Sequence, residues 1–86
     1  MNAQIERAGN RIAGFHVCDW LVPTTDLVFD RGMPGDGVID IAGIRAEVEA
    51  AGYRGAVECE LLSHRWWQQD ADLVLRTVKE RYASVC

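Results

Sequence analysis

The sequence has no long apolar run, no paired cysteine motif and no excess of basic residues. Its apolar stretches are far shorter than the roughly 18 residues that a membrane-spanning helix needs. The three cysteines, Cys18, Cys59 and Cys86, are odd in number and form no CxxC pair, so we expect reduced thiols rather than a disulfide framework or a zinc site. The first nine residues contain no apolar signal core, and we therefore expect a cytoplasmic protein.

Acidic residues outnumber basic ones. Asp and Glu total 13 against 9 for Lys and Arg, which gives a net charge of -4 over 86 residues. This charge is a poor match for phosphate backbones and anionic membranes, so neither nucleic acids nor membranes are expected partners. The length permits one domain, which we place at residues 1–86, and a domain of this size leaves much of its surface exposed.

Helical and strand-like patterns alternate along the chain. Residues 3–8 favour a helix, residues 11–18 alternate as a strand, and residues 19–38 read as a long loop without regular structure, rich in turn formers. A helix over 40–51 begins at an Asp N-cap, and Gly52 is expected to end it in a left-handed conformation.

The second half of the chain repeats this order. Residues 55–62 alternate as a strand, a short loop follows, and Asp70 caps a last helix that runs to about residue 85. Strands that alternate with helices predict βαβ units with a parallel sheet, so the fold class is α/β.

Each predicted strand carries its ionisable side chains on one face. His16 points to the face opposite Phe15 and Val17, and Glu58 and Glu60 share a face of the second strand. Carboxylates on the inner face of an otherwise apolar strand are costly to bury unless they are paired or bound to a cation. The pattern therefore indicates a polar site on one side of the sheet.

Four motifs, in this order, resemble those of a known family: HVCDW at 16–20, DRGMPGDG at 30–37, AGYRG at 51–55 and ECELLS at 58–63. With them, residues 10–86 resemble the C-terminal part of the xylose isomerase-like TIM barrel family. That family includes sugar-phosphate isomerases and epimerases, inosose dehydratases and the endonuclease IV type of repair enzyme. The resemblance implies a partial (β/α)8 barrel made of the seventh and eighth strand–helix units.

The resemblance also implies a metal site. His16 and Glu60, at the ends of the two strands, would bind a divalent metal such as Mn²⁺, Mg²⁺, Co²⁺ or Zn²⁺. Glu60 would also be the catalytic base of an isomerase or epimerase that works through an enediolate, and Arg31 would contact the sugar or sugar phosphate. Glu58 is the alternative to Glu60 as the metal ligand. If it is not a ligand, it would contact the ligand side chains rather than the metal itself. Asp19 reaches either the site or the loop.

Other readings of these residues stay open. Arg31 could instead brace its loop through a salt bridge. We interpret Trp66 and Trp67 as a packing or subunit contact, with a sugar-stacking platform as the alternative, and His64 as a solvated loop residue.

The family's other two metal ligands lie on earlier strands that are not in this sequence. We therefore expect a C-terminal fragment that is inactive alone and that self-associates or joins the remainder of a barrel. Two other functions stay open, a non-catalytic barrel remnant or interaction module and an endonuclease IV-like hydrolase. Gly32 stands where the endonuclease branch carries a further metal-binding histidine, which disfavours the hydrolase.

Overall fold

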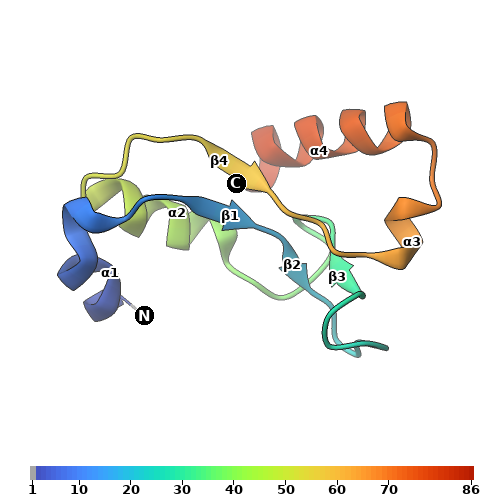
Figure 1. The fold of residues 1–86 in the computed structure, drawn as a ribbon, viewed down its shortest axis with the longest axis horizontal. Helices are drawn as coiled ribbons and strands as arrows, with labels where there is room; N and C mark the ends of the chain where they lie inside the picture. Colours follow the sequence, from blue (N-terminus) through green and yellow to red (C-terminus); the bar gives the residue numbers. More distant parts are fainter. Residues whose placement is uncertain (1) are drawn as a thin grey trace.

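The computed structural model describes residues 2–86. Met1 lies outside the described residues. It is the first residue of the N-terminal segment in which we expect no signal core. The elements in chain order are α1 (Asn2–Ala8), the 3-10 turn η1 (Gly9–Arg11), β1 (Phe15–Val17), β2 (Asp19–Trp20), β3 (Arg31–Gly32), α2 (Ile41–Ala50), β4 (Val57–Cys59), α3 (His64–Trp67) and α4 (Ala71–Val85). Figure 1 shows this arrangement.

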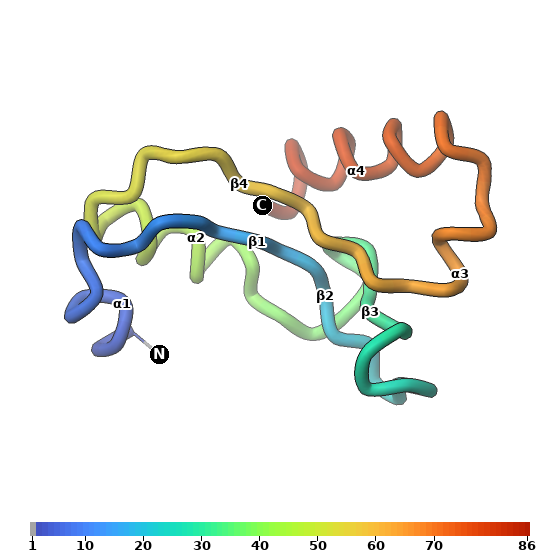
Figure 2. Tube along the Cα trace, viewed as in Figure 1, coloured from blue at the N-terminus to red at the C-terminus, as the bar shows by residue number. Residues whose placement is uncertain are grey.

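A parallel pair of strands forms the centre of the fold. β1 pairs with β4, with His16 opposite Glu58 and Val17 opposite Cys59. The chain leaves β1, passes through α2 and returns along β4, as the tube in Figure 2 shows. This β1–α2–β4 unit confirms the predicted α/β fold with parallel strands, and it has the arrangement that the resemblance to a (β/α)8 barrel implies.

Helix α2 begins and ends as its capping residues predict. The Asp40 carboxylate accepts a hydrogen bond from the Gly43 amide at 3.1 Å. At the other end Gly52 has φ +109°, as expected, and the Tyr53 amide donates to the Val48 carbonyl at 3.3 Å, which is the backbone hydrogen bond of a Schellman motif. Val48 itself is 5% exposed, and burial of such a side chain stabilises the fold by about 1.5–3 kcal/mol.

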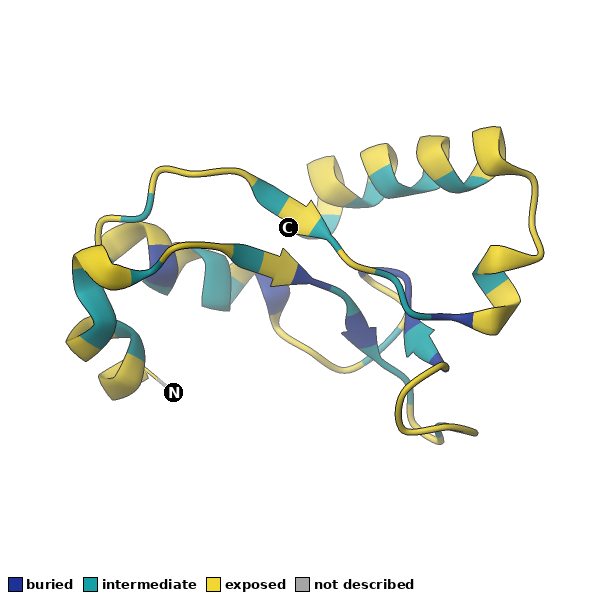
Figure 3. Cartoon of the chain, viewed as in Figure 1, coloured by how far each residue is buried: buried dark blue, intermediate teal, exposed yellow. Residues whose placement is uncertain are grey.

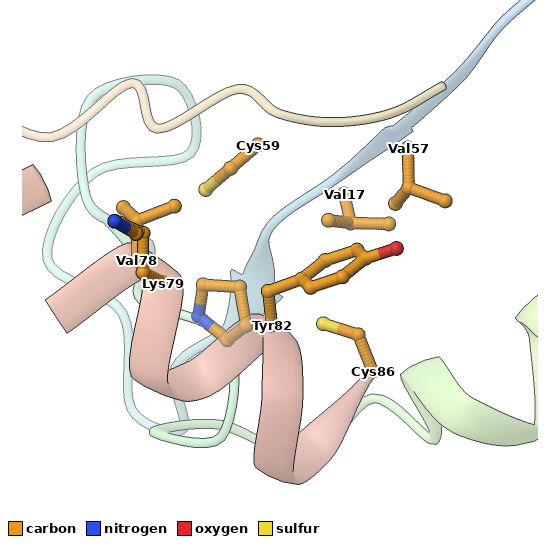
Figure 4. A pocket seen from close by; sticks show the side chains of 8 residues that line it. Val17, Val57, Cys59, Val78, Lys79, Tyr82 and Cys86 are labelled. Carbon is orange, nitrogen blue, oxygen red and sulfur yellow. The ribbon is translucent and has the colours of Figure 1, made fainter. Parts of the chain in front are cut away.

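The outer face of the sheet faces α4 across a cavity. Figure 4 shows Val17 and Val57 of the strands facing Tyr82 and Cys86 at the end of this helix, around a cavity of about 350 Å³. Burial raises the pKa of the Cys59 and Cys86 thiols, which keeps them neutral. All three cysteines are free of disulfide bonds.

Both strands are shorter than their alternation predicts. The ladder covers residues 15–17 and 57–59 rather than 11–18 and 55–62. Arg11 instead ends the turn that Gly9 begins with φ +50°. An alternating pattern reports which face a side chain takes, whereas hydrogen bonding needs a neighbouring strand, and within residues 2–86 β1 and β4 have only each other.

The prediction of a structureless loop over 19–38 is wrong. β2 and β3 lie within it and pair in antiparallel fashion, with Asp19 opposite Gly32 and Trp20 opposite Arg31. The loop then crosses the end of β4 through an isolated bridge between Asp30 and Ser63. Two-residue strands carry no readable periodicity, so the pairing depends on hydrogen bonds that only the folded loop makes.

Burial is concentrated where β1, β2, β3 and the start of α2 meet. Figure 3 shows this region in dark blue, and Met33 and Asp19 are among its most buried side chains. In contrast, α1 and α4 contain no buried residue. No helix within residues 2–86 is both long enough and apolar enough to cross a bilayer.

Candidate metal and substrate site

His16 lies between two carboxylates on the inner face of the sheet. Its Nε2 is 2.8 Å from Glu58 Oε2, and its Nδ1 is 3.2 Å from Glu60 Oε2. The parallel register explains this contact because Glu58 is the cross-strand partner of His16 and Glu60 is the next residue on the same face. The structure therefore brings together the three side chains that the sequence placed on one face.

The site lies at the carboxyl end of the parallel pair. Glu60 directly follows the last residue of β4, and its amide donates to the Val17 carbonyl at 3.0 Å. In parallel barrels this end of the strands carries the active site. The side chains of His16, Glu58 and Glu60 are 53%, 63% and 58% exposed, so a ligand can reach all three.

The donor types suit a divalent cation, although the side chains contact each other instead. An imidazole nitrogen with carboxylate oxygens is a ligand set that Mn²⁺, Co²⁺ and Zn²⁺ accept. Within the part of the chain that the structure describes, no three His, Cys, Asp or Glu side chains are arranged to hold a metal ion. The reason is geometric, because the two ring nitrogens of His16 face different carboxylates. For His16 to bind a metal ion, Glu58 or Glu60 would have to move away from the ring nitrogen that it now contacts.

Asp19 faces the loop. It is 1% exposed, and its carboxylate accepts hydrogen bonds from the amides of Gly35, Gly37 and Ile39, each at 2.9 Å. Burial alone would raise the pKa of this carboxyl, but these amides and that of Trp20 together hold the pKa below its usual value. Asp19 therefore fixes the shape of the loop that carries Arg31.

Arg31 is held above the end of β4. Its own amide donates to the Leu62 carbonyl at 3.0 Å, two residues beyond Glu60. Its Nε and Nη2 donate to the Leu27 carbonyl at 3.2 and 3.0 Å, and the guanidinium lies 5.3 Å from the centroid of the Trp20 ring. These contacts involve a carbonyl and an aromatic ring, so the loop is braced without the salt bridge that was considered for Arg31.

His64 is exposed, as expected, but it lies in the short helix α3 rather than in a loop, and it belongs to an aromatic cluster that follows β4. His64 is the first residue of α3, and its ring lies 5.0 Å from that of Phe29 and 5.4 Å from that of Trp67. The Ser63 hydroxyl accepts a hydrogen bond from the Trp66 amide at 3.2 Å and so starts this short helix. A serine three residues before Trp66 was the sequence signal for the helix.

The family model described as xylose isomerase-like TIM barrel matches residues 1–79. The chain belongs to this family. Protein SMc04130 from Sinorhizobium meliloti 1021, known from a crystal structure, is similar at 53% identity with a TM-score of 0.94. The match covers 99% of this chain and 32% of that one, so this family member spans about a third of the length of its solved relative. A search of curated proteins finds no match.

Family membership accounts for the arrangement of the elements. In a xylose isomerase-like barrel, β1 and β4 are neighbouring strands of one parallel sheet, and α2 and α4 lie on the outside of that sheet. The inner face with His16 and Glu60 is then the side that points to the barrel axis.

Proposed function

We propose that this chain supplies part of the active site of a metal-dependent sugar or sugar-phosphate isomerase or epimerase. The observation that supports the proposal is the 3.2 Å approach of Glu60 Oε2 to His16 Nδ1 at the carboxyl end of the parallel pair. His16 and Glu60 would hold a divalent cation, with Glu58 as the neighbouring carboxylate. Further ligands would come from outside these residues.

The side chains divide the chemistry between them. When bound, a divalent cation supplies Lewis acidity to neighbouring sugar oxygens. The Glu60 carboxylate takes the proton from the carbon next to the carbonyl, which leaves an enediolate. Return of the proton from Glu60 to the adjacent carbon completes an isomerisation, whereas an epimerisation needs a second proton donor on the opposite face of the enediolate, supplied from outside these residues. The forked donors of Arg31 hold a hydroxyl or phosphate oxygen of the same sugar. The loop contacts of Asp19 keep Arg31 near the end of β4.

Metal binding tests the ligand assignment. Calorimetric titration of the chain with Mn²⁺ or Zn²⁺ should give an affinity that His16→Ala lowers by at least about tenfold, because the variant loses a direct ligand. His64→Ala is the matched control, since it removes the chain's other histidine, and it should leave the affinity unchanged. Equal affinities of the parent and His16→Ala would show that His16 is not a ligand.

The same titration separates the two carboxylates. If Glu60 is the ligand, Glu60→Gln lowers metal affinity more than Glu58→Gln does; the reverse order would move the ligand to Glu58. A non-catalytic interaction module is the second candidate, because no ready-made three-ligand cluster occurs within residues 2–86. Under that function, metal affinity would be the same in the parent and in all of these variants.

A further inference from the structure

A polar cavity lies where the loop after β1 crosses the end of β4. It measures about 210 Å³, and Arg31 and Arg65 both line it, together with Ser63 and Trp66. The crossing is fixed by the bridge between Asp30 and Ser63 and by the hydrogen bond from the Arg31 amide to Leu62. The cavity is therefore built from two loops that both follow parallel strands.

We propose that this cavity binds the phosphate, or an equivalent anionic group, of the substrate, which makes the substrate a sugar phosphate or sugar acid rather than a neutral sugar. This rests on the proposed function for the identity of the substrate. Loops after the seventh and eighth strands hold phosphate groups in many (β/α)8 barrels. Pockets that enclose a whole drug-sized ligand measure about 300–1,000 Å³, so this smaller cavity suits one anionic group.

The two guanidinium groups keep donors for such a group. Arg65 Nη2 is 3.8 Å from Asp30 Oδ1, which is an ion pair too long for a hydrogen bond. The contact of Arg31 with the Leu27 carbonyl uses Nε and Nη2 and leaves Nη1 outside that bond. The side chain of Arg65 is 65% exposed, so it can turn toward an anion without breaking the fold.

The carboxylates of the cavity already have partners. Asp30 accepts from the Thr25 amide at 2.9 Å, and this bond is the first cause that lowers the pKa of its carboxyl. Asp36 Oδ1 lies 2.7 Å from Arg81 Nη1. The lining carries two guanidinium groups and two carboxylates, and Arg81, which lies outside the lining, neutralises the charge of Asp36.

Ser63 adds a neutral donor. It is 1% exposed, and its Oγ accepts from the Trp66 amide, so the hydroxyl hydrogen is still available for donation to an oxyanion. Phosphate binding sites commonly combine Arg forks with hydroxyl donors of this kind. The cavity thus offers charge and hydrogen-bond donors from both loops.

The test is an NMR and calorimetric titration of the full chain with inorganic phosphate. We expect shifts of the Trp66 indole and of the Arg31 and Arg65 side-chain signals, and a roughly tenfold or greater loss of affinity in Arg65→Ala, as for the loss of a charged hydrogen bond. Arg65→Lys keeps the charge and should retain part of the affinity. Arg76→Ala, on exposed α4, removes the same charge elsewhere and should bind as the parent does.

A second titration compares ribose 5-phosphate with free ribose. Tighter binding of the phosphate ester, abolished by Arg65→Ala, supports the assignment to substrate. The proposal is overturned if phosphate does not bind, if Arg65→Ala binds it as the parent does, or if Arg76→Ala weakens binding equally. Each result is independent of metal affinity in His16→Ala, so a failed anion site is distinguishable from a failed metal site.

Discussion

Asp19, the first residue of β2, and Glu60, the residue directly after β4, are both carboxylates, yet their surroundings differ. Asp19 is 1% exposed and accepts bonds from several backbone amides. The Glu60 side chain is 58% exposed and faces His16. A buried carboxylate that satisfies so many amides is committed to the loop, whereas an exposed carboxylate beside an imidazole can exchange that partner for a ligand.

Asp19→Asn should destabilise the fold by about 2–3 kcal/mol, because an amide group would replace an oxygen that accepts from two backbone amides. The free energy of unfolding in urea measures this loss. Asp72→Asn is the control, since it removes an exposed carboxylate from the first turn of α4. A loss for Asp19→Asn no larger than that of the control would contradict the loop-bracing function.

The pH dependence of stability carries the same information. The pKa of Asp19 is lower in the folded chain than in the unfolded chain. Its contribution is therefore complete above the unfolded pKa of about 3.9 and is lost as the pH falls through the folded value. The free energies of unfolding of the parent and of Asp19→Asn, measured from pH 6 downward, should converge only at the acid end of the range. Parallel losses for both proteins would contradict this linkage.

Side-chain alternation was enough to predict which residues share the inner face. His16, Glu58 and Glu60 follow from a period of two, and the register confirms the face. Alternation could not decide between the two carboxylates, because both are on that face and each contacts a different nitrogen of His16. The loop contacts of Asp19 were equally hidden, since they join residues 16 to 20 positions apart.

At the scale of elements, the loop over 19–38 is ordered by close backbone approach. Gly37 donates to Asp19 Oδ2 and lies so near Trp20 that a Cβ would meet the Trp20 carbonyl oxygen and come within 2.6 Å of Asp19 Oδ1. The Val38 amide also donates to the Trp20 carbonyl at 3.1 Å. The loop thus folds back on β2 at a position where only glycine fits.

Gly37→Ala should lower the free energy of unfolding by at least about 1–3 kcal/mol, because the added methyl group would overlap backbone atoms of Trp20. Gly14→Ala is the matched control. Its Cβ would meet only the Nε2 of His16 at 3.8 Å, so we expect a change within about 0.5 kcal/mol. Urea unfolding compares the two variants. Similar stabilities would show that the loop does not depend on this approach.

Capping residues predicted the helices better than alternation predicted the strands. Asp40 and Asp70 each accept a bond from the amide three residues later, as expected of N-caps. A cap is a local interaction, so the sequence contains both partners within a few positions. β2, β3 and the cavity at Arg31 and Arg65 bring together residues that are far apart in sequence, and nothing in one sequence specifies that contact.

The molecule as a whole is less compact than a typical globular monomer of the same mass. Its accessible surface is 5878 Å², against about 5,100 Å² expected for a compact 9.6 kDa chain. Its radius of gyration is 13.7 Å, against about 12 Å. The two-stranded sheet has open edges within residues 2–86, and Leu75 and Trp67 beside β4 are 60% and 54% exposed.

These features predict that the chain associates with further copies of itself. An apolar groove of about 490 Å³ lies beside β4 and is lined by Leu61, Trp67 and Leu75, among others. Exposure of this apolar surface to water is unfavourable, so its burial against another copy would stabilise a dimer or larger oligomer. The mass from sedimentation should therefore rise above 9.6 kDa with concentration, and the urea midpoint should rise with it. Leu75→Lys should shift both toward the monomer, whereas Ala83→Lys, elsewhere on α4, should not. A monomer at every concentration with a high, constant midpoint would mean that two strand–helix units are stable alone.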